Sequence, residues 1–321
     1  MMKKRCLWLL VLACIAPSFS CNSKPTTPPA GDKQEALTGA DIALFDNGKL
    51  SFYNSSNNTL VPLTVEKDFV VDGVFGQEDY FYYTVAIKDK LYLKRVQLSA
   101  PKPEKVTDWG LQLNQCFLES CDKAAMTGYA QAPVIKIEYD LDEEYCEFMK
   151  ERYYHLLNQT MSEEMPDGLV LRNYDDDEEE SDETLFYTEE VEDETASEDE
   201  EGYKNYYYYT PGKVCLSDQI DFDALGGYYQ PTFELRSISP TRDGVVFAGY
   251  TDWGHVGHGP LCYATLDGKV QQILTDDAVD AYWGWLSDGR VAFVNHEGSK
   301  ILAPDGTEQL ISTAKKLVTS K

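Results

Sequence analysis

Two stretches near the end of the chain, TRDGVVFAGY (Thr241–Tyr250) and LSDGRVAFVNH (Leu286–His296), repeat one pattern. In each, a polar turn that contains Asp-Gly is followed by apolar residues, and the two Asp-Gly pairs lie 45 residues apart. Asp-Gly supplies the positive φ of a tight hairpin turn, so each stretch predicts a strand, a turn and a strand. A second pair follows each of these, at Asp267-Gly268 and Asp305-Gly306. The order therefore predicts four short antiparallel strands in about 40 residues.

The same pattern occurs earlier in the chain, with less regularity. Ile42–Leu63 supplies two or three strands around an Asn-Gly turn, residues 68–107 supply four more, and Met165–Tyr174 contains a further Asp-Gly turn. Four strands at this period make one blade of a β-propeller, in which blades bury their faces by packing in a ring. The sequence predicts an all-β fold with about six four-stranded blades, irregular in the N-terminal half. The alternative is an open stack or a β-sandwich.

The residues around the Asp-Gly turns also carry a resemblance to a known class. The arrangement of a small polar residue, Asp-Gly and then alternating apolar residues resembles the repeats of TolB-like and WD40-like propellers. The resemblance covers the last two predicted blades well and the first four poorly. It implies a fold and no activity.

Two segments depart from this strand pattern. In residues 142–160, four apolar or aromatic residues recur at helical spacing, which predicts a helix: Tyr145, Met149, Tyr153 and Leu156. Between Asp175 and Glu201, 17 of 27 residues are acidic and none is basic. Self-repulsion and poor burial favour a disordered, solvated insertion there, within which Leu185–Tyr187 is compatible with one strand. Weak capture of calcium, or docking of a basic partner, is the functional alternative for this run.

The N-terminus predicts an exported and lipidated protein. Lys3, Lys4 and Arg5 precede an apolar run of ten residues, which is too short to span a bilayer. Small residues and Cys21 follow, and this ending resembles the lipobox of Bacteroides-type envelope lipoproteins, which implies lipid attachment at Cys21. The alternatives are a box ending at Cys14 and a plain signal peptide. We expect residues 1–20 to be the signal peptide, 21–40 a flexible tether and 41–321 the propeller domain.

Charge and localisation restrict the partners. The formal charge is −27, and it becomes −30 without residues 1–20, which carry three bases and no acids. Such a chain repels the phosphates of nucleic acids, so no nucleic acid partner is expected. We expect an outer membrane lipoprotein of the cell envelope, on the periplasmic face or the cell surface, whose lipid anchors it and whose fold binds a protein or a glycan.

Few residues suggest chemistry. Five cysteines follow Cys21, so at least one is a free thiol, and the pair Cys116/Cys121 is compatible with a disulfide or with an inert core. Asp252, His255 and His258 lie in one glycine-rich stretch and are weak candidates for metal ligands, because their spacing is not that of a helical zinc site. No nucleophile elbow, phosphate loop or dinucleotide motif is present. We expect no cofactor, apart from the calcium hypothesis for the acidic run.

The aromatic residues offer the remaining candidates for a site. Exposed aromatic rings can stack on sugars or peptides, and those near the Asp-Gly turns are the candidates for ligand binding, together with the two histidines: Trp253, His255, His258, Trp283 and Trp285. The sequence therefore favours a non-enzymatic binding or scaffold module. The alternative is a carbohydrate-active enzyme that uses carboxylates in the propeller channel. A third hypothesis is a surface protein that buffers cations through the acidic run.

Overall fold

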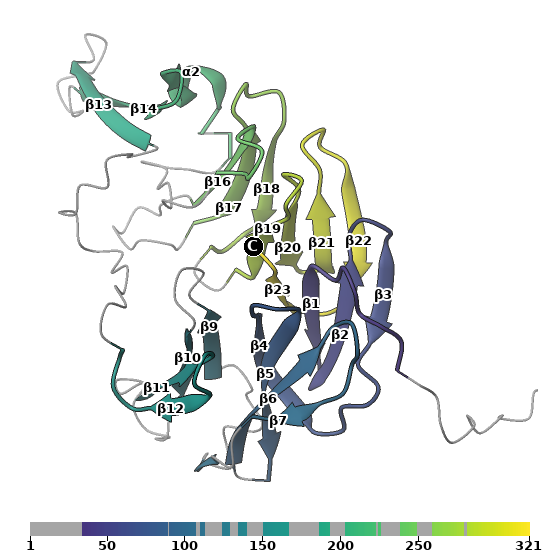
Figure 1. Cartoon of the computed structure of the whole chain (residues 1–321). Coiled ribbons are helices and arrows are strands. Elements are labelled where there is room, and N and C mark those ends of the chain that lie inside the picture. Colours follow the sequence, from purple (N-terminus) through teal and green to yellow (C-terminus); the bar gives the residue numbers. More distant parts are fainter. Residues whose placement is uncertain are drawn as a thin grey trace, which may run out of the picture. The chain divides into compact units, whose positions relative to one another are not determined.

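Short antiparallel hairpins make up almost all of the regular structure (Figure 1). The structure is a computed structural model, and it describes residues 34–88, 90–106, 110–112, 124–128, 134–139, 150–166, 186–192, 203–222, 224–225, 238–248, 259–278 and 281–321. The described residues belong to one unit, Gln34–Lys321. Within them, no helix has the length and apolar character that crossing a bilayer requires.

The strands of the described residues form six small sheets, which we name A to F. Sheet A contains β23 (Lys316–Thr319), β1 (Ile42–Asp46), β2 (Lys49–Asn54) and β3 (Thr59–Pro62) in that order. Sheet B contains β4 (Phe69–Phe75), β5 (Tyr80–Ile87), β6 (Lys90–Gln97) and β7 (Glu104–Lys105), and β8 (Leu111–Gln112) also pairs with β6. Sheet C contains β9 (Ala124–Gly128), β10 (Val134–Tyr139), β11 (Lys150–His155) and β12 (Thr160–Ser162).

The remaining three sheets come from the C-terminal half. Sheet D contains β13 (Phe186–Glu192), β14 (Tyr203–Tyr209) and β15 (Val214–Cys215), and the one-turn helix α2 (Leu216–Gln219) follows it. Sheet E contains β16 (Gly244–Ala248), β17 (Leu261–Thr265) and β18 (Gln271–Thr275). Sheet F contains β19 (Trp283–Trp285), β20 (Val291–Asn295), β21 (Gly298–Leu302) and β22 (Glu308–Ser312). The prediction of an all-β fold built from small antiparallel sheets is confirmed.

Apolar clusters join sheets that follow one another in the chain. The described residues contain five such clusters, between sheets A and B, B and C, D and E, E and F, and F and A. Aromatic contacts mark several of them: Phe52 meets Phe81 between A and B at 5.0 Å, and Tyr82 meets Tyr154 between B and C at 6.1 Å. Both faces of sheets A, B, E and F are thus covered, which accounts for the buried residues on both faces of strands such as β16 and β21.

The first and last strands of the fold pair with each other. Ile42 of β1 lies opposite Thr319 of β23, and the antiparallel register continues to Phe45 and Lys316. Sheet A therefore combines three strands from the start of the fold with one from its end (Figure 1). This pairing protects a strand edge that would otherwise be open, and it ties the C-terminus to sheet B through the contact of β23 with β4.

One buried ion pair links the edge strands of three sheets. Strands β19, β23, β4 and β9 contact one another in that order, and we call them the inner strands. Asp72 of β4 accepts a charged bond from Lys316 of β23 at 3.0 Å and hydrogen bonds from the backbone N–H groups of Met126 in β9 and of Gly73, both at 2.8 Å. A bulge in β4 between Val70 and Asp72 directs this side chain. Burial raises the pKa of Asp72 although Lys316 and the two N–H groups act against it.

The two stretches that define the repeat occupy matching places. Strand β20 is the second strand of sheet F, and β16 is the second strand of sheet E if the single bridge of Ile238 to Val245 counts as the first. Val245 faces the preceding sheet, as Val291 does, so the matching apolar residues are 46 apart rather than 45. Because side chains alternate along a strand, an offset of 45 would have placed every side chain on the wrong face.

The one-residue difference comes from the turns. Gly289 has the positive φ of its turn, at 86°, whereas in the first stretch Arg242 has it, at 59°, and Gly244 already begins β16. The Asp243-Gly244 pair therefore does not supply the left-handed residue that we predicted, while Gly268, Gly289 and Gly306 do. The extra residue is accommodated because the backbone N–H of Ser239 donates to Gly244 five residues on, at 2.8 Å.

Three sequence predictions need correction. The helix predicted for 142–160 is wrong from Lys150 onward, because β11 alternates Tyr154 toward sheet B with Tyr153 on the opposite face; residues 142–149 lie outside the described residues. Within the acidic run 175–201, the one strand that the sequence allowed around Leu185–Tyr187 extends further than expected, because Phe186–Glu192 forms β13 and pairs along its length with β14. The tether ends before residue 40, since Leu37 is 3% exposed and its N–H donates to Leu98 O at 2.7 Å.

Replacing Gly289 with Ala should lower the free energy of unfolding by about 1–2 kcal/mol, whereas Arg242→Gly should leave it unchanged or raise it by up to about 1 kcal/mol. A β-carbon at Gly289 would lie 2.1 Å from Thr241 Oγ1 and the backbone there has φ +86°, while Arg242 carries a side chain in a conformation that glycine adopts freely. Urea denaturation of both variants measures this. Equal losses at the two positions would contradict the equivalence of these turns.

Removing one partner of the inner-strand ion pair should destabilise the fold strongly. We expect Asp72→Ala to lower the free energy of unfolding by about 3–5 kcal/mol, because it leaves the Lys316 ammonium buried without its counter-charge. Glu104→Ala is the matched control, since its partner Arg95 forms an exposed pair worth about 1 kcal/mol or less. In the double variant Asp72→Ala/Lys316→Ala the loss should be well below the sum of the single losses. Additive losses would show that the two groups do not interact.

Candidate binding groove

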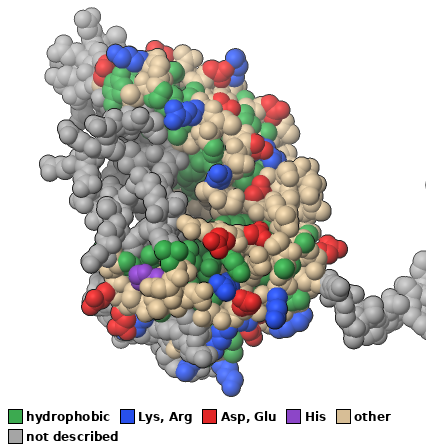
Figure 2. Space-filling view, in the orientation of Figure 1, with side chains coloured by type: hydrophobic (Ala, Val, Ile, Leu, Met, Phe, Trp, Pro, Cys, Tyr) green, Lys and Arg blue, Asp and Glu red, His purple; other side chains and the backbone are tan. Residues whose placement is uncertain are grey.

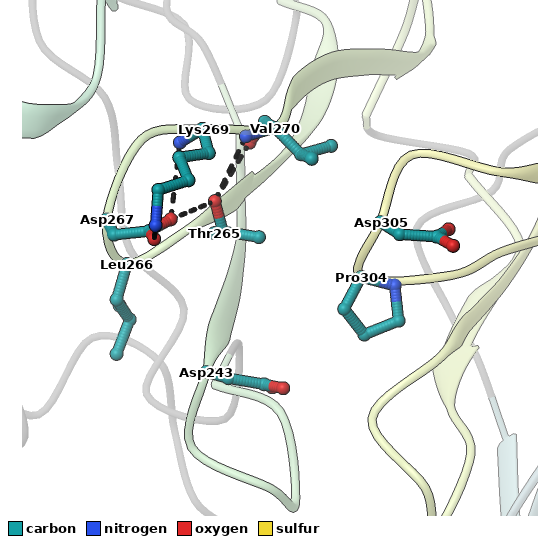
Figure 3. A pocket seen from close by; sticks show the side chains of 8 residues that line it. All are labelled: Asp243, Thr265, Leu266, Asp267, Lys269, Val270, Pro304 and Asp305. Atoms are coloured by element: carbon teal, nitrogen blue, oxygen red, sulfur yellow. Dashed lines mark hydrogen bonds and ion pairs between the residues drawn. The ribbon is translucent and has the colours of Figure 1, made fainter.

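Sheets E and F enclose a depression where their Asp-Gly hairpins meet, and we call it the groove. Its volume is about 440 Å³, and Figure 3 shows Pro304 and Asp305 of one hairpin standing opposite Thr265 and Val270 of the other. It is lined by Asp243, Thr265, Leu266, Asp267, Lys269, Val270, Pro304 and Asp305. Three of the four Asp-Gly turns identified in the C-terminal sequence thus contribute an aspartate to one place.

Hairpin geometry fixes the walls of the groove. Gly268 allows the β17–β18 turn with φ +67°, and a β-carbon there would lie 1.8 Å from the carbonyl oxygen of Gln219. Gly306 allows the β21–β22 turn with φ +85°, and a β-carbon there would lie 3.5 Å from Val270. Both turns need the positive φ that glycine adopts freely, and at Gly268 a side chain would also collide with the backbone of Gln219. The groove is a consequence of where the sequence places its glycines.

Asp243 presents one oriented carboxylate to the groove. Its Oδ1 accepts hydrogen bonds from Ser239 Oγ and Thr241 Oγ1, both at 2.6 Å. These bonds hold the side chain on the groove side, and Figure 3 shows it pointing toward Pro304. Its Oδ2 makes no hydrogen bond or ion pair with the residues that the structure describes. A carboxylate has lone pairs on both oxygens, so Asp243 keeps acceptor capacity for a further donor.

Asp267 differs from Asp243 because it forms an ion pair with a neighbouring lysine. It accepts a hydrogen bond from Thr265 Oγ1 at 2.8 Å and pairs with the exposed Lys269. These contacts hold the pKa of the Asp267 carboxyl at about 2. In Figure 3 the third carboxylate, Asp305, points away from Thr265, and it accepts the N–H of Thr307 at 2.9 Å. Asp243 is therefore the carboxylate of the groove with most capacity for a ligand.

A buried hydroxyl lies close to Gly244, the residue that follows Asp243. Tyr263 precedes Thr265 by two residues on β17, so both side chains project from the same face, and Thr265 pairs with Gly244. The Tyr263 hydroxyl lies 2.8 Å from the position of a β-carbon on Gly244, which places it at the level of the Gly244–Thr265 pair. The residue is 1% exposed, and its hydroxyl has no hydrogen-bond partner among the described residues. Burial, and then the charges of Asp243 and Asp267, raise the pKa of Tyr263 to about 12.

Two other polar clusters are neutralised internally. Lys94 binds Glu66 at 2.9 Å and Asp68 at 2.6 Å, and Tyr83 donates to Glu66 at 2.6 Å. Burial acts to raise the pKa of Glu66, but the hydrogen bonds from Tyr83, the Asp68 N–H and Lys94 outweigh it and hold the pKa below its usual range. A general acid needs a raised pKa near the working pH, so this cluster is suited to holding sheets A and B together rather than to proton transfer.

Sheet C carries the second such cluster. Lys136 binds Glu138 at 2.5 Å and Glu151 at 2.6 Å, and Tyr153 donates to Glu151. Burial opposes the charge on Glu151, yet the hydrogen bonds from Lys136 and Tyr153 keep its pKa below the ordinary value. Both carboxylates thus pair with one ammonium group. They lack the separated pKa values that acid–base catalysis by two carboxyl groups requires.

Much of the large formal charge comes from one run of the sequence. The run 175–201 holds 17 of the 55 acidic residues and no basic residue, so the rest of the chain is only mildly acidic. Figure 2 shows acidic and basic side chains interspersed over the face it presents. A ligand at the groove is thus selected by the local carboxylates more than by the field of the whole fold.

The structure describes only some of the residues that the sequence predicted to form a site. Trp253, His255, His258 and Asp252 lie outside the described residues. Trp283 is half-buried on β19, and Trp285 is 6% exposed and packs against the Tyr263 ring at 6.1 Å, so its flat faces are occupied by the core. The described residues contain no group of three potential metal ligands. Cys262 is a buried free thiol whose pKa burial raises to about 12, and Cys215 is also free.

The sequence reasoning missed the groove itself. It used the Asp-Gly pairs as turn markers, and it did not consider that turns of neighbouring sheets meet. The groove could have been predicted from the repeat, because its turn aspartates recur at similar positions in successive sheets. The Tyr263 hydroxyl had no signal, because an alternating strand such as LCYAT predicts a core tyrosine equally well with or without a partner.

Comparison with known proteins gives distant matches only. No family model matches the chain, and no curated protein matches it. Solved structures that are similar include a TolB-type protein of Agrobacterium tumefaciens, with 12% identity over 88% of this chain and 90% of that one and a TM-score of 0.35. The GH74 enzyme of Niastella koreensis has 9% identity, covers 89% of this chain and 44% of its own, and has a TM-score of 0.36.

A third match concerns a peptide-bond hydrolase. The AtxE2 isopeptidase has 6% identity over 88% of this chain and 52% of its own length, with a TM-score of 0.39. A gluconolactonase of Xanthomonas campestris also matches, with 7% identity, 88% and 79% coverage and a TM-score of 0.31. The neighbours thus include TolB-like propeller proteins and unrelated enzymes. At these identities and scores they assign neither a family nor an activity to this chain.

Proposed function

We propose that the chain is an envelope lipoprotein, anchored through Cys21, whose sheets form a six-bladed β-propeller that binds a protein or a glycan. The support for the ring comes from the order of packing. Four of the five apolar clusters join sheets that are adjacent in the sequence, the fifth joins the last sheet to the first, and the last strand completes the first sheet. Such an order is typical of blades arranged around an axis, in which every internal face is covered by the next blade.

The observation that carries the binding role is the composition of the inner strands. Strands β4, β9, β19 and β23 hold a single carboxylate, Asp72, and it is bound to Lys316 and to two backbone N–H groups. A glycosidase in the channel requires two carboxyl groups about 5–10 Å apart. These four strands instead bring an ion pair and apolar side chains together. They favour a scaffold over the alternative of a carbohydrate-active enzyme.

The site of binding is proposed to be the groove. It is built on rigid hairpins of two adjacent sheets, and it combines apolar walls with oriented polar groups, which is the usual composition of a ligand site. A lipidated Cys21 followed by the segment up to residue 33 would hold this surface near the membrane. No cofactor is needed for such a role, and calcium at the acidic run stays a hypothesis.

Anchoring is tested at Cys21. Cells that express the full chain and are grown with labelled palmitate should incorporate label into the wild type and into Cys14→Ala, and lose it completely in Cys21→Ala. The reason is that only the modified cysteine becomes the lipidated first residue, and the acyl chains hold the protein at the bilayer. Label and membrane fractionation are measured together. Label that persists in Cys21→Ala would contradict lipid attachment at Cys21. Loss of label in Cys14→Ala would assign the attachment to Cys14 instead.

Binding is distinguished from catalysis with the full-length lipoprotein in detergent. Purified bacterial cell-surface polysaccharides should yield no new reducing ends over extended incubation, because the inner strands offer no pair of carboxyl groups. The positive result is saturable binding of one of these glycans, or a discrete adduct when a photoreactive residue replaces Asp305 on intact cells. Lys90, in the β5–β6 hairpin, is the matched control position. Heat-sensitive release of reducing ends, or neither glycan binding nor an adduct, would contradict the proposed function.

A further inference from the structure

We infer that the end of sheet A that holds the β1–β2 turn is the surface with which the fold contacts the lipid bilayer. This assignment depends on the proposed lipid anchor at Cys21 and adds the orientation of the fold on the membrane. The contact surface, which we call the membrane face, consists of four side chains from β2 and from the connection of β3 to β4: Lys49, Val65, Lys67 and Phe69. The partner is a bilayer rather than a protein or a second copy of the chain.

Gln34 fixes the place at which the N-terminal segment joins the fold. Its side chain donates a hydrogen bond to Pro62 O at 2.9 Å. Its Oε1 accepts hydrogen bonds from the N–H and the hydroxyl of Thr64, at 2.7 and 2.9 Å, and from the N–H of Val65 at 3.3 Å. Residues 22–33 separate Gln34 from the proposed lipid anchor, and a chain of this length spans at most about 45 Å. The anchor therefore holds the β3–β4 connection within that distance of the bilayer.

Two exposed apolar side chains lie in this connection. Val65 is 37% exposed and Phe69 is 36% exposed. The connection lies against the β1–β2 turn, because the N–H of Val70 donates to Gly48 O at 2.9 Å and a β-carbon on Gly48 would lie 2.2 Å from the Phe69 ring. Single exposed apolar residues are common on protein surfaces. These two are distinguished by their position, because the loop that carries Val65 is the one that binds Gln34.

The charges of the membrane face also suit a bilayer. The acids of the β3–β4 connection, Glu66 and Asp68, both bind Lys94, at 2.9 and 2.6 Å. The exposed Lys49 and Lys67 have no carboxylate partner among the residues that the structure describes. Lysine stems extend along apolar surface while their ammonium groups stay in water, so such residues remain among the lipid headgroups when apolar neighbours enter the boundary with the acyl chains.

Two exposed carboxylates balance these lysines. Glu35 follows Gln34 in the chain, and Asp46 lies beside the β1–β2 turn, where it pairs with Lys49 in the strand register. The membrane face thus carries little net charge, although the whole chain is strongly acidic. Contact with the bilayer is therefore expected to depend on the apolar side chains, and to need no anionic lipid.

The lipid anchor makes a small membrane face sufficient. Two partly exposed apolar side chains would not hold a free protein on a bilayer, since even a single myristoyl chain binds only marginally. Once the acyl chains are inserted, contact of the membrane face becomes intramolecular, with an effective concentration on the order of millimolar for a short connection. The face then needs little affinity of its own to fix the orientation of the fold.

This orientation turns the groove away from the membrane. Strand β2 runs from the β1–β2 turn to the β2–β3 turn, so these turns mark opposite ends of sheet A. Arg290 of the β19–β20 turn donates to Ser55 O of the β2–β3 turn at 3.1 Å. A β-carbon on Gly289 of the β19–β20 turn would lie 2.1 Å from Thr241 Oγ1, which donates to Asp243 of the groove. The groove therefore belongs to the end of the sheets that is free to meet a partner.

The test uses the full-length lipoprotein in vesicles of phosphatidylcholine. A benzophenone amino acid replaces Val65 or Phe69, or Leu157 as the control, and lipid adducts are quantified by mass spectrometry after illumination. Leu157 is 81% exposed in the β11–β12 turn, which corresponds to the β2–β3 turn in strand order. We expect at least about tenfold more adduct at the membrane face than at the more exposed Leu157. Phosphatidylglycerol in the vesicles should change the yield less than about twofold.

A matched pair of variants separates docking from simple proximity to the bilayer. With the photoreactive residue at position 69, Val65→Asp should lower the yield of lipid adducts about fivefold, because it places a charge where an apolar side chain enters the lipid. Leu157→Asp introduces the same charge at the opposite end of the sheets and should change the yield less than about twofold. Both positions are exposed, and thermal unfolding of each variant checks that the fold is retained.

Several outcomes would overturn the assignment. They are equal yields at Phe69 and Leu157, equal effects of the two aspartate variants, or protein adducts in place of lipid adducts at Val65 and Phe69 on intact cells. The failure of the proposed function has a different signature. A wild-type chain that incorporates no palmitate has no anchor, whereas a palmitate-labelled chain without lipid adducts at the membrane face retains its anchor and loses only this orientation.

Discussion

Every sheet of this protein is too small to hide its own faces, and that constraint organises the rest. A three- or four-stranded sheet with apolar residues on both sides is stable only between two neighbours. In the described residues the chain meets the requirement by packing sheets A and B, B and C, D and E, and E and F against each other, as in the contact of Phe81 with Phe52. The first and last sheets of the sequence are joined in a different way. The last strand of the fold, β23, pairs with β1 in the first sheet.

The Asp72–Lys316 pair adds specificity to this packing. Apolar side chains such as Val71 and Leu317 would tolerate several alignments of neighbouring strands, whereas a buried carboxylate tolerates only the one that supplies all its donors. Taking both charges out of water costs free energy, and the raised pKa of Asp72 reflects that cost. The Asp72–Lys316 pair therefore contributes more to the specificity of strand alignment than to the free energy of unfolding.

Sequence reasoning predicted the regular parts of the fold and failed where tertiary contacts override local pattern. The Asn47-Gly48 turn, the hairpins at Gly268 and Gly306 and the strands around Val245 and Val291 follow from composition and alternation alone. The helix proposed around Tyr153 failed because apolar and aromatic residues at spacing three to four do not exclude a strand, and in β11 Tyr153 and Tyr154 are buried on opposite faces.

The site was harder to foresee than the fold, for a physical reason. A groove exists only between elements, so the sequence of one hairpin does not show which residues of another hairpin will stand opposite it. In the acidic run, the sequence indicated a strand around Tyr187 but not its length or its partner, Tyr208, on which Tyr187 stacks at 5.0 Å. The acidic composition predicted that the segment is solvated. The pairing of β13 with β14, which includes the Tyr187–Tyr208 contact, gives it regular structure.

The position of β23 also has a consequence for biogenesis. Because Thr319 pairs with Ile42, the contact that completes sheet A joins residues separated by nearly the whole domain. A chain is synthesised from its N-terminus, so the edge of β1 that β23 covers stays unpaired until Lys316–Thr319 has been made. Folding of such long-range pairings is slow. Completion of sheet A is therefore a late step in the formation of this fold.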